Sequence, residues 1–389
     1  MVKVAERVEE LPPYLFVQIR QKEREARARG IDIISLGVGD PDRPTPSHIV
    51  DTLVEAAHDP AMHVYPPDEE RGMRAFRAAI ARWYKRRFGV TLDEDQHVLA
   101  LIGSKEGNHH VALAYLNPGD VALIPDPAYP AYVASAILAG AQVVRLPLYA
   151  EHGWLLRFQD IPSDLARKAK VLWLNYPNNP TTALAPRSFW KEAAEWAQTF
   201  DTIVVNDFPY SEIAFSESTV SALSTGRLNV PVVEFNSLSK PYNMTGWRIG
   251  MAVGNPDIIA ALRKVKENTD SGIFGAIQRA GIAALDGPQD NIVAMVELYR
   301  HRRDLVVETW ESIGLRMEAP KATFYVWAPI PQDMRSMEFA SALLVKAGVV
   351  VTPGIGYGDQ GDHYVRMSLT IADDRLEEAM RRIKAVGKW

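Results

Sequence analysis

The chain has 389 residues, of which 47% are hydrophobic, so it can bury a large core and is long enough for two domains. Its formal net charge of -5 comes from 43 basic and 48 acidic residues that are intermixed, which creates no field that would recruit nucleic acid or an anionic membrane. The sequence has 0 cysteines, which excludes disulfides, thiolate metal sites and cysteine catalysis.

The sequence shows no targeting or linker signal. The N-terminus is charged and lacks the apolar core of a signal peptide, and no apolar run is long enough to span a bilayer. Glycine and proline are spread along the chain, and no low-complexity linker stands out. We therefore expect a compact protein of the cytoplasm that binds neither nucleic acid nor a membrane.

One turn in the N-terminal part has the composition of a ligand-contacting loop. A helical pattern over residues 17–29 ends at Gly30, and an apolar run at 33–36 leads into the turn 37–42, Gly-Val-Gly-Asp-Pro-Asp. Its glycines either relieve local strain or let the backbone approach a ligand. A plain tight turn explains these residues at least as well.

From residue 98 onward, short apolar runs alternate with loops and helical segments. The runs are residues 98–102, 121–125, 142–146, 171–175, 203–207, 232–236 and 249–253. They are rich in valine, isoleucine and leucine and mostly lack apolar/polar alternation, which is typical of strands buried on both faces. The sequence therefore predicts an α/β fold in which a seven-stranded, mostly parallel sheet is sandwiched by helices.

Chemically suggestive residues follow these runs, at the sheet edge where such folds bind ligands. After the first run, Gly103-Ser104-Lys105-Glu106-Gly107 opens a helix. With Ser104 as the predicted N-cap, the free N–H groups make an anion site, although every capped helix offers the same donors. His109 and His110 follow as neighbours that point in different directions, so we predict no metal site.

Three further runs are followed by polar or aromatic side chains. Tyr129 and Tyr132 come after the second run, and Asn179 lies in a proline-flanked turn after the fourth. Asp207 ends the fifth run and is followed by Tyr210. As structure alone, the proline-flanked segment around Asn179 is a good turn signal, and an aspartate at a strand end is often only a turn or cap residue.

The loop between the sixth and seventh runs holds Lys240 in the pattern S-x-S-K, with Arg248 eight positions later. One interpretation is a solvated loop lysine. The other is a Schiff-base lysine, whose amine must lie in an enclosed site that favours its neutral, nucleophilic form. The serines at 237 and 239 and the guanidinium would then supply two hydroxyls and a cation for a phosphate.

The C-terminal part predicts a smaller α+β domain. A long amphipathic pattern over 289–313 carries the cluster 301–303, His-Arg-Arg, which we interpret as a solvated helix face because no aromatic residues are interleaved with it. Residues 322–371 alternate short strands with a helix. Arg366 stands in an otherwise apolar run there, where a lone arginine is often an edge or snorkelling residue.

Taken in order, these motifs resemble the class I/II aminotransferases of fold type I, which depend on pyridoxal 5'-phosphate (PLP). The match extends from residue 11 to residue 370. It implies an N-terminal arm and part of the small domain over 1–49, a large PLP-binding domain over 50–285 and a small C-terminal domain over 286–389. It also implies a homodimer with shared active sites, acting on a small-molecule amino acid and a 2-oxo acid.

The resemblance implies a role for each residue around the cofactor. Lys240 would form the Schiff base and serve as catalytic base, and Asp207 would pair with the pyridine nitrogen. Asn179 and Tyr210 would bind the phenolic oxygen, and Tyr129, preferred over Tyr132, would stack on the ring. The phosphate would be bound by Ser104, Lys105, Ser237, Arg248 and, from the other subunit, Tyr65.

The resemblance also implies the substrate contacts. Arg366 would grip the α-carboxylate bidentately, with Asn179 and the turn at Gly39 beside it. Tyr14 would close over the site. Lys105 would reach the distal end of the substrate, and Glu70 falls where diaminopimelate-specific relatives place a substrate-binding glutamate.

Three residues depart from the family pattern. Glycine is usual where Thr182 stands, which puts the local backbone geometry in question. Smaller residues are usual where Phe208 and Pro209 stand, and we expect this pair to narrow the pocket beside the ring.

Within the family, L-P-P-Y-L-F, G-S-K-E-G and N-M-T-G-W-R-I-G look most like the LL-diaminopimelate aminotransferases. These exchange an amino group between glutamate/2-oxoglutarate and the tetrahydrodipicolinate/LL-diaminopimelate pair of lysine biosynthesis. Alternatives are an aspartate, alanine or aromatic aminotransferase, or a PLP-dependent C–S β-lyase that would use the same core residues. A non-enzymatic regulatory protein of this fold would be expected to have lost some of these core residues, and none of them is missing.

Overall fold

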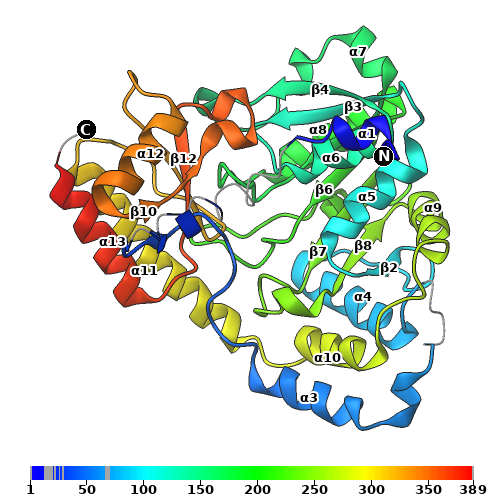
Figure 1. Cartoon of the computed structure of the whole chain (residues 1–389). Coiled ribbons are helices and arrows are strands. Elements are labelled where there is room, and N and C mark those ends of the chain that lie inside the picture. Colours follow the sequence, from blue (N-terminus) through cyan, green and yellow to red (C-terminus); the bar gives the residue numbers. More distant parts are fainter. Residues whose placement is uncertain are drawn as a thin grey trace.

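A seven-stranded sheet forms the centre of the larger part of the molecule (Figure 1). The computed structural model describes residues 2–12, 21, 23–25, 27–28, 30–65 and 71–387. Across the sheet, the described strands are β2 (Val98–Leu101), β8 (Gly250–Gly254), β7 (Val232–Ser237), β6 (Ile203–Asp207), β5 (Ala169–Leu174), β3 (Val121–Asp126) and β4 (Gln142–Pro147). Among these described strands, β8 alone points in the direction opposite to all the others, which confirms the predicted mostly parallel sheet.

Helices cover both faces of this sheet. They are α4 (Arg74–Phe88), α8 (Arg187–Phe200) and α10 (Gly275–Asp286) on one face and α5 (Ser104–Tyr115), α6 (Ala131–Leu138) and α9 (Pro256–Glu267) on the other. Successive strand residues enter different cores: Val98 and Ala100 pack beside α4, whereas Leu99 and Leu101 pack beside α5. Burial on both faces explains the missing alternation. The edge strand β4 differs from the prediction, because its residues other than Leu146 are at least partly exposed.

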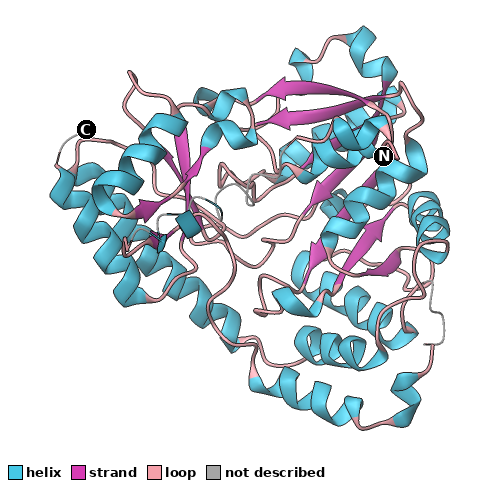
Figure 2. Ribbon diagram, viewed as in Figure 1, coloured by secondary structure: helices cyan, strands magenta, loops and turns pink. Residues whose placement is uncertain are grey.

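A second core combines residues from the N-terminal and C-terminal parts of the chain. Its elements are β1 (Ile34–Ser35), α11 (Asp290–Ser312), β9 (Tyr325–Pro329), α12 (Ser336–Ala347), β10 (Val349–Val350), β11 (Thr352–Pro353), β12 (Tyr364–Ser368) and α13 (Asp373–Val386). Here β11, β12 and β9 form an antiparallel sheet, β1 pairs with β10, and the helices pack around them (Figure 2). The domain boundaries proposed from the sequence remain predictions.

The described chain also contains the α-helices α1 (Glu6–Glu9), α3 (Ser47–Ala57) and α7 (Ser163–Lys168), together with short 3-10 helices. Helix α3 lies along α10 at the lower edge of the molecule in Figure 1. In the described ranges, no helix has both the length and the apolar character needed to cross a bilayer.

Arg302 corrects one prediction about α11. Its cluster was expected to form a solvated face, yet the Arg302 side chain is only 1% exposed. Its Nη1 and Nη2 donate to the two oxygens of Asp42 at 2.9 Å each, and its Nε donates to Asp373 at 2.6 Å. A buried charge is stable only when it is paired in this way. Arg302 therefore ties the turn at 37–42 and the start of α13 to α11.

Candidate active site

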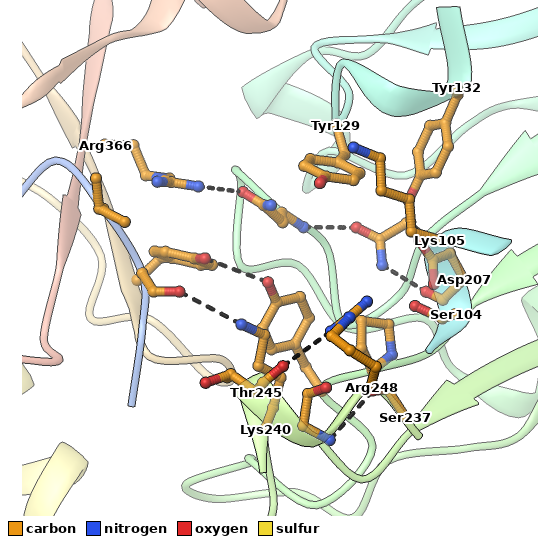
Figure 3. A pocket seen from close by; sticks show the side chains of 18 residues that line it. Ser104, Lys105, Tyr129, Tyr132, Asp207, Ser237, Lys240, Thr245, Arg248 and Arg366 are labelled. Atoms are coloured by element: carbon orange, nitrogen blue, oxygen red, sulfur yellow. Dashed lines mark hydrogen bonds between the residues drawn. The ribbon is translucent and has the colours of Figure 1, made fainter. Parts of the chain in front are cut away.

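A cavity of about 280 Å³ lies where the carboxyl ends of β6 and β7 meet the start of α5. Figure 3 draws the eighteen described residues that line it. Predicted site residues among them are Gly39, Ser104, Lys105, Tyr129, Asn179, Asp207, Tyr210, Ser237, Lys240, Arg248 and Arg366. Two more had an expected place in the pocket, Ser239 as a hydroxyl for a phosphate and Pro209 as a residue that narrows it. Those for which the sequence predicted no role in the site are Val38, Tyr132, Asn175, Thr245 and Tyr325. In the described part of the chain, no cluster of three or more His, Asp or Glu side chains is placed to hold a metal ion.

Lys240 extends into the cavity from the turn that follows β7. Its Nζ donates to the carbonyl oxygen of Gly39 at 3.3 Å and lies 5.5 Å from the ring centroid of Phe324. Burial lowers the pKa of Lys240, because the ammonium loses the solvation that water provides. A larger neutral fraction makes this amine a better nucleophile and base than a surface lysine.

Asp207 is the last residue of β6, and its carboxylate is buried. Its Oδ2 accepts hydrogen bonds from Asn108 Nδ2 and from the hydroxyl of Tyr132, each at 3.0 Å. Its Oδ1 is buried and has no hydrogen-bond partner among the described residues. Burial raises the pKa of Asp207 to about 6. A buried carboxylate oxygen in this state calls for a donor, above all a cationic one, inside the cavity.

The raised pKa of Asp207 predicts how the stability of the ligand-free protein depends on pH. The raised pKa of Asp207 means that the folded state binds the proton more tightly than the unfolded chain does. Its stabilising contribution is therefore complete below about pH 4 and is lost as the pH rises through about 6. We expect the free energy of unfolding of the wild type, minus that of Asp207→Asn, to fall by up to about 3 kcal/mol between these limits.

Denaturant unfolding of both proteins across this pH range measures that difference, and the subtraction removes the titration of the other carboxylates. A difference that does not change with pH would show that Asp207 titrates normally.

Asn108 and Trp173 hold Asp207 in place, and neither was predicted from the sequence. The indole Nε1 of Trp173 donates to Asn108 Oδ1 at 3.0 Å, which turns the amide nitrogen of Asn108 toward Asp207. Asn108 follows Ser104 by four positions, one helical turn into α5, and its Nδ2 also contacts the Ser104 carbonyl oxygen at 3.2 Å. Helical spacing from Ser104 is the signal that would have indicated Asn108.

The start of α5, which lies close to Asp207, has the features of an anion site. Helix α5 begins at Ser104, so its first N–H groups and its positive dipole end lie beside the cavity that Ser104 and Lys105 line. The N-cap is Gly103, not Ser104 as predicted. Gly103 has φ 93°, and a Cβ there would lie 2.6 Å from Arg248 Nη2, so glycine is required.

Arg248 and Ser237 complete this anion site. Arg248 donates from Nη1 to the carbonyl oxygen of Thr245 at 2.9 Å and from Nη2 to that of Ile102 at 3.2 Å, which brings its guanidinium to the α5 terminus. Ser237 ends β7, and its Oγ accepts from the backbone N–H of Ser239 at 3.1 Å. The S-x-S-K pattern is thus a tight turn that places Ser237 and Lys240 on the same cavity.

Arg366 enters from the opposite side of the cavity to Asp207 (Figure 3). It stands in the middle of β12 and is fully buried, so the edge-strand interpretation does not apply. Its Nη1 donates to Asn179 Oδ1 and its Nη2 to the carbonyl oxygen of Gly37, both at 2.9 Å. A buried guanidinium whose ends are held at two points is suited to bind a carboxylate in a fixed orientation.

The comparisons with known proteins agree with this geometry. A family model for "Aminotransferase class I and II" matches residues 31–383. The chain is a member of this family. LL-diaminopimelate aminotransferases of Dehalococcoides mccartyi and Moorella thermoacetica are 54% and 51% identical to it over 383 residues, which cover 98% of both chains in each case. The substrate-bound structure of BacF from Bacillus subtilis superimposes with a TM-score of 0.94 at 37% identity, covering 99% of this chain and 98% of that one.

This aminotransferase is therefore an enzyme, a transaminase that moves an amino group between an amino acid and a 2-oxo acid. The family also explains why one cavity combines a buried lysine, a buried carboxylate, an anion site and a buried arginine. The lysine, the carboxylate and the anion site lie just beyond the ends of strands of the seven-stranded sheet, and Arg366 reaches the same cavity from β12 in the three-stranded sheet.

Of three further residues predicted for the aminotransferase site, one lies away from the cavity and two are not among the described residues. Tyr65 is 76% exposed, and it is not among the described residues that line the cavity. Tyr14 and Glu70 lie outside the described residues.

The structure shows how the three residues that depart from the family pattern are accommodated. Thr182 adopts φ 65°, a left-handed conformation like that of the usual glycine. Phe208 packs into the core against Phe88, with ring centroids 5.5 Å apart, and of the pair 208–209 it is Pro209 that lines the cavity. Of these two residues, it is therefore Pro209 that is placed to narrow the cavity, and Phe208 does not contribute.

Proposed function

We propose that this aminotransferase binds PLP and exchanges an amino group between LL-2,6-diaminopimelate/tetrahydrodipicolinate and glutamate/2-oxoglutarate in lysine biosynthesis. The observation that carries the cofactor assignment is the buried Oδ1 of Asp207, which has no partner among the described residues and lies in the same cavity as Lys240. The substrate assignment is supported by relatives of that name, 51% and 54% identical along 98% of the chain.

The residues of the cavity fit PLP at each of its polar groups. The pyridinium N–H is the cationic donor that Asp207 Oδ1 requires. The phosphate fits the start of α5, where Ser104, Lys105, Ser237 and Arg248 converge. The aldehyde carbon fits the amine of Lys240, whose pKa is lowered by burial. We assign the phenolic oxygen to Asn179 and Tyr210 and the ring face to Tyr129, all of which line the cavity.

The mechanism follows from where these side chains stand. When bound, PLP supplies an electron sink that stabilises negative charge on the substrate Cα. Arg366 binds the substrate α-carboxylate and so directs the Cα–H bond toward Lys240. The amine of Lys240, in its neutral form, would take the proton from Cα as a general base. Asp207 keeps the ring nitrogen protonated, and Tyr210 donates to the phenolic oxygen.

We also propose a cytoplasmic homodimer with shared sites. Val64 and Tyr65 are 66% and 76% exposed, and Phe274 is 42% exposed, with its ring 5.6 Å from that of His63. An exposed aromatic and aliphatic patch of this kind suits a protein contact. In this arrangement Tyr65 reaches the phosphate of the other subunit, and Tyr14, Glu70 and Lys105 serve substrate binding.

Half-reactions test the substrate assignment. The PLP-loaded protein is mixed singly with LL-diaminopimelate, glutamate, aspartate, alanine or phenylalanine, without an oxo acid, and the visible absorbance is followed. We expect LL-diaminopimelate and glutamate to convert the yellow cofactor to the pyridoxamine form at least ~10-fold faster than the others. The reason is that discrimination at a polar substrate group exceeds this factor when its binding site is matched.

The other outcomes separate the rival functions. Conversion by aspartate, alanine or phenylalanine instead would keep the aminotransferase and discard the diaminopimelate assignment. Pyruvate release from cysteine conjugates without an oxo acid would identify a C–S β-lyase.

A further inference from the structure

Tyr325 contacts both Tyr210, which we assign to the cofactor, and Arg366, which we assign to the substrate. It is the first residue of β9, it is 3% exposed, and it lines the cavity. No motif in the sequence pointed to it, because it stands in an apolar strand of the second core. Its two parts, the hydroxyl and the ring, contact different members of the site.

The hydroxyl of Tyr325 meets Tyr210. The Tyr210 hydroxyl donates to Tyr325 Oη at 3.3 Å, and the two rings meet edge to face with centroids 5.7 Å apart. The same hydroxyl fills the space over Gly39, where any Cβ would overlap it. Gly39 therefore has to be glycine because the Tyr325 hydroxyl occupies the position of a side chain.

The ring of Tyr325 contacts the guanidinium of Arg366. The guanidinium carbon of Arg366 lies 3.9 Å from the ring centroid of Tyr325 and 5.1 Å from that of Tyr357. Because Arg366 is fully buried, its attraction to the ring face is screened little by water. This contact holds the guanidinium against the face of the Tyr325 ring, while Asn179 and Gly37 accept hydrogen bonds from its two ends.

We propose that Tyr325 is a positioning residue with two separable functions. Its hydroxyl strengthens Tyr210 as the donor to the phenolic oxygen of the cofactor, and its ring orients Arg366 for the substrate carboxylate. The inference rests on the proposed function, since it assumes PLP beside Tyr210 and a carboxylate at Arg366.

The hydroxyl acts through a chain of hydrogen bonds. With PLP bound, Tyr210 donates to the phenolic oxygen, and the Tyr325 hydroxyl then donates to the Tyr210 oxygen. Hydrogen bonds in such a chain strengthen one another. Without the Tyr325 hydroxyl, Tyr210 stabilises the charge on the phenolic oxygen less well. The proton on the nitrogen that joins Lys240 to PLP is then held more tightly, and the pKa of that nitrogen rises.

Two variants separate the functions. Tyr325→Phe removes the hydroxyl and keeps the ring, whereas Tyr325→Leu removes both. A matched control is Tyr299→Phe, because the Tyr299 hydroxyl is also buried in the second core, near Phe324, but lacks a hydrogen-bond partner among the described residues. Two quantities are measured on each PLP-loaded protein: the pH midpoint of the visible absorbance change, and the Kd of pimelate, a seven-carbon dicarboxylate without an amine.

For Tyr325→Phe we expect the pH midpoint to rise by roughly 0.5, with the pimelate Kd unchanged within about twofold. For Tyr325→Leu we expect the same rise and a pimelate Kd about tenfold weaker. Tyr299→Phe should match the wild type in both quantities.

The proposal is overturned if Tyr325→Phe titrates like the wild type, or if Tyr325→Leu binds pimelate as the wild type does. It is also overturned if Tyr299→Phe shows the same changes, because they would then report general loosening of the second core. Failure of the wild type to form the yellow PLP complex would overturn the proposed function and this inference together, and so is distinguishable from failure of Tyr325 alone.

Discussion

Replacing Lys240 by alanine is expected to abolish transamination, with a loss in kcat of at least about 10⁴-fold. The loss is this large because the proposed mechanism gives the amine two tasks. In that mechanism it is the nucleophile that binds the cofactor covalently and the base that moves the proton at the substrate Cα. The measurements are glutamate formation from 2-oxoglutarate and the mass of the Lys240 peptide after borohydride reduction of the PLP-loaded protein.

Lys105→Ala is the matched control, because Lys105 is a second lysine that lines the cavity. Borohydride reduction should still attach the cofactor to Lys240 in this variant, although activity is expected to fall where Lys105 contacts phosphate or substrate. Labelling of Lys105 in the wild type, or normal turnover by Lys240→Ala, would remove Lys240 from the mechanism.

The sheet could be predicted because its strands carry the signal in their own residues. Burial on both faces requires continuous apolar runs, and each predicted run coincides with an observed strand to within two residues. Strand β4 was predicted equally well in position but not in burial, because an edge strand with a polar surface resembles a central one in a short window.

The site was predictable where a residue type is rare at its position, and not where it is ordinary. Lys240, Asp207 and Arg366 stand out as charges beside apolar strands. Tyr325 and Trp173 look like core aromatics, and their roles come from contacts with Tyr210, 115 positions away, and Asn108, 65 positions away. Contacts at such separations are made by the fold and leave no local pattern.

The burial of Arg302 was also missed, because it depends on partners that are distant in the sequence. Within α11 this arginine belongs to a basic cluster, and a cluster of this kind is usually solvated. Its partners Asp42 and Asp373 are 260 and 71 positions away, so local sequence could not reveal the burial.

Asp207→Ala is expected to keep PLP bound but to slow removal of the Cα proton by roughly 10³-fold. The phosphate contacts and Lys240 still hold the cofactor. Without a carboxylate opposite it, however, the pyridine nitrogen loses its proton and no longer draws electrons from the substrate. Single-turnover conversion of the yellow form by glutamate measures this step. Asp207→Asn should be slowed similarly, because its amide can take the place of the carboxylate beside Tyr132 and Asn108 but carries no charge.

A cofactor analogue distinguishes loss of charge from loss of structure. N-methylated PLP carries a permanent positive charge on its ring nitrogen, so it needs no carboxylate to remain cationic. If Asp207 acts by keeping that nitrogen protonated, the analogue should restore part of the lost rate to Asp207→Ala and none to Lys240→Ala. An unchanged rate in Asp207→Ala would take the carboxylate out of the mechanism. A slow variant that the analogue does not accelerate would mean that Asp207 acts mainly by holding Tyr132 and Asn108 in place.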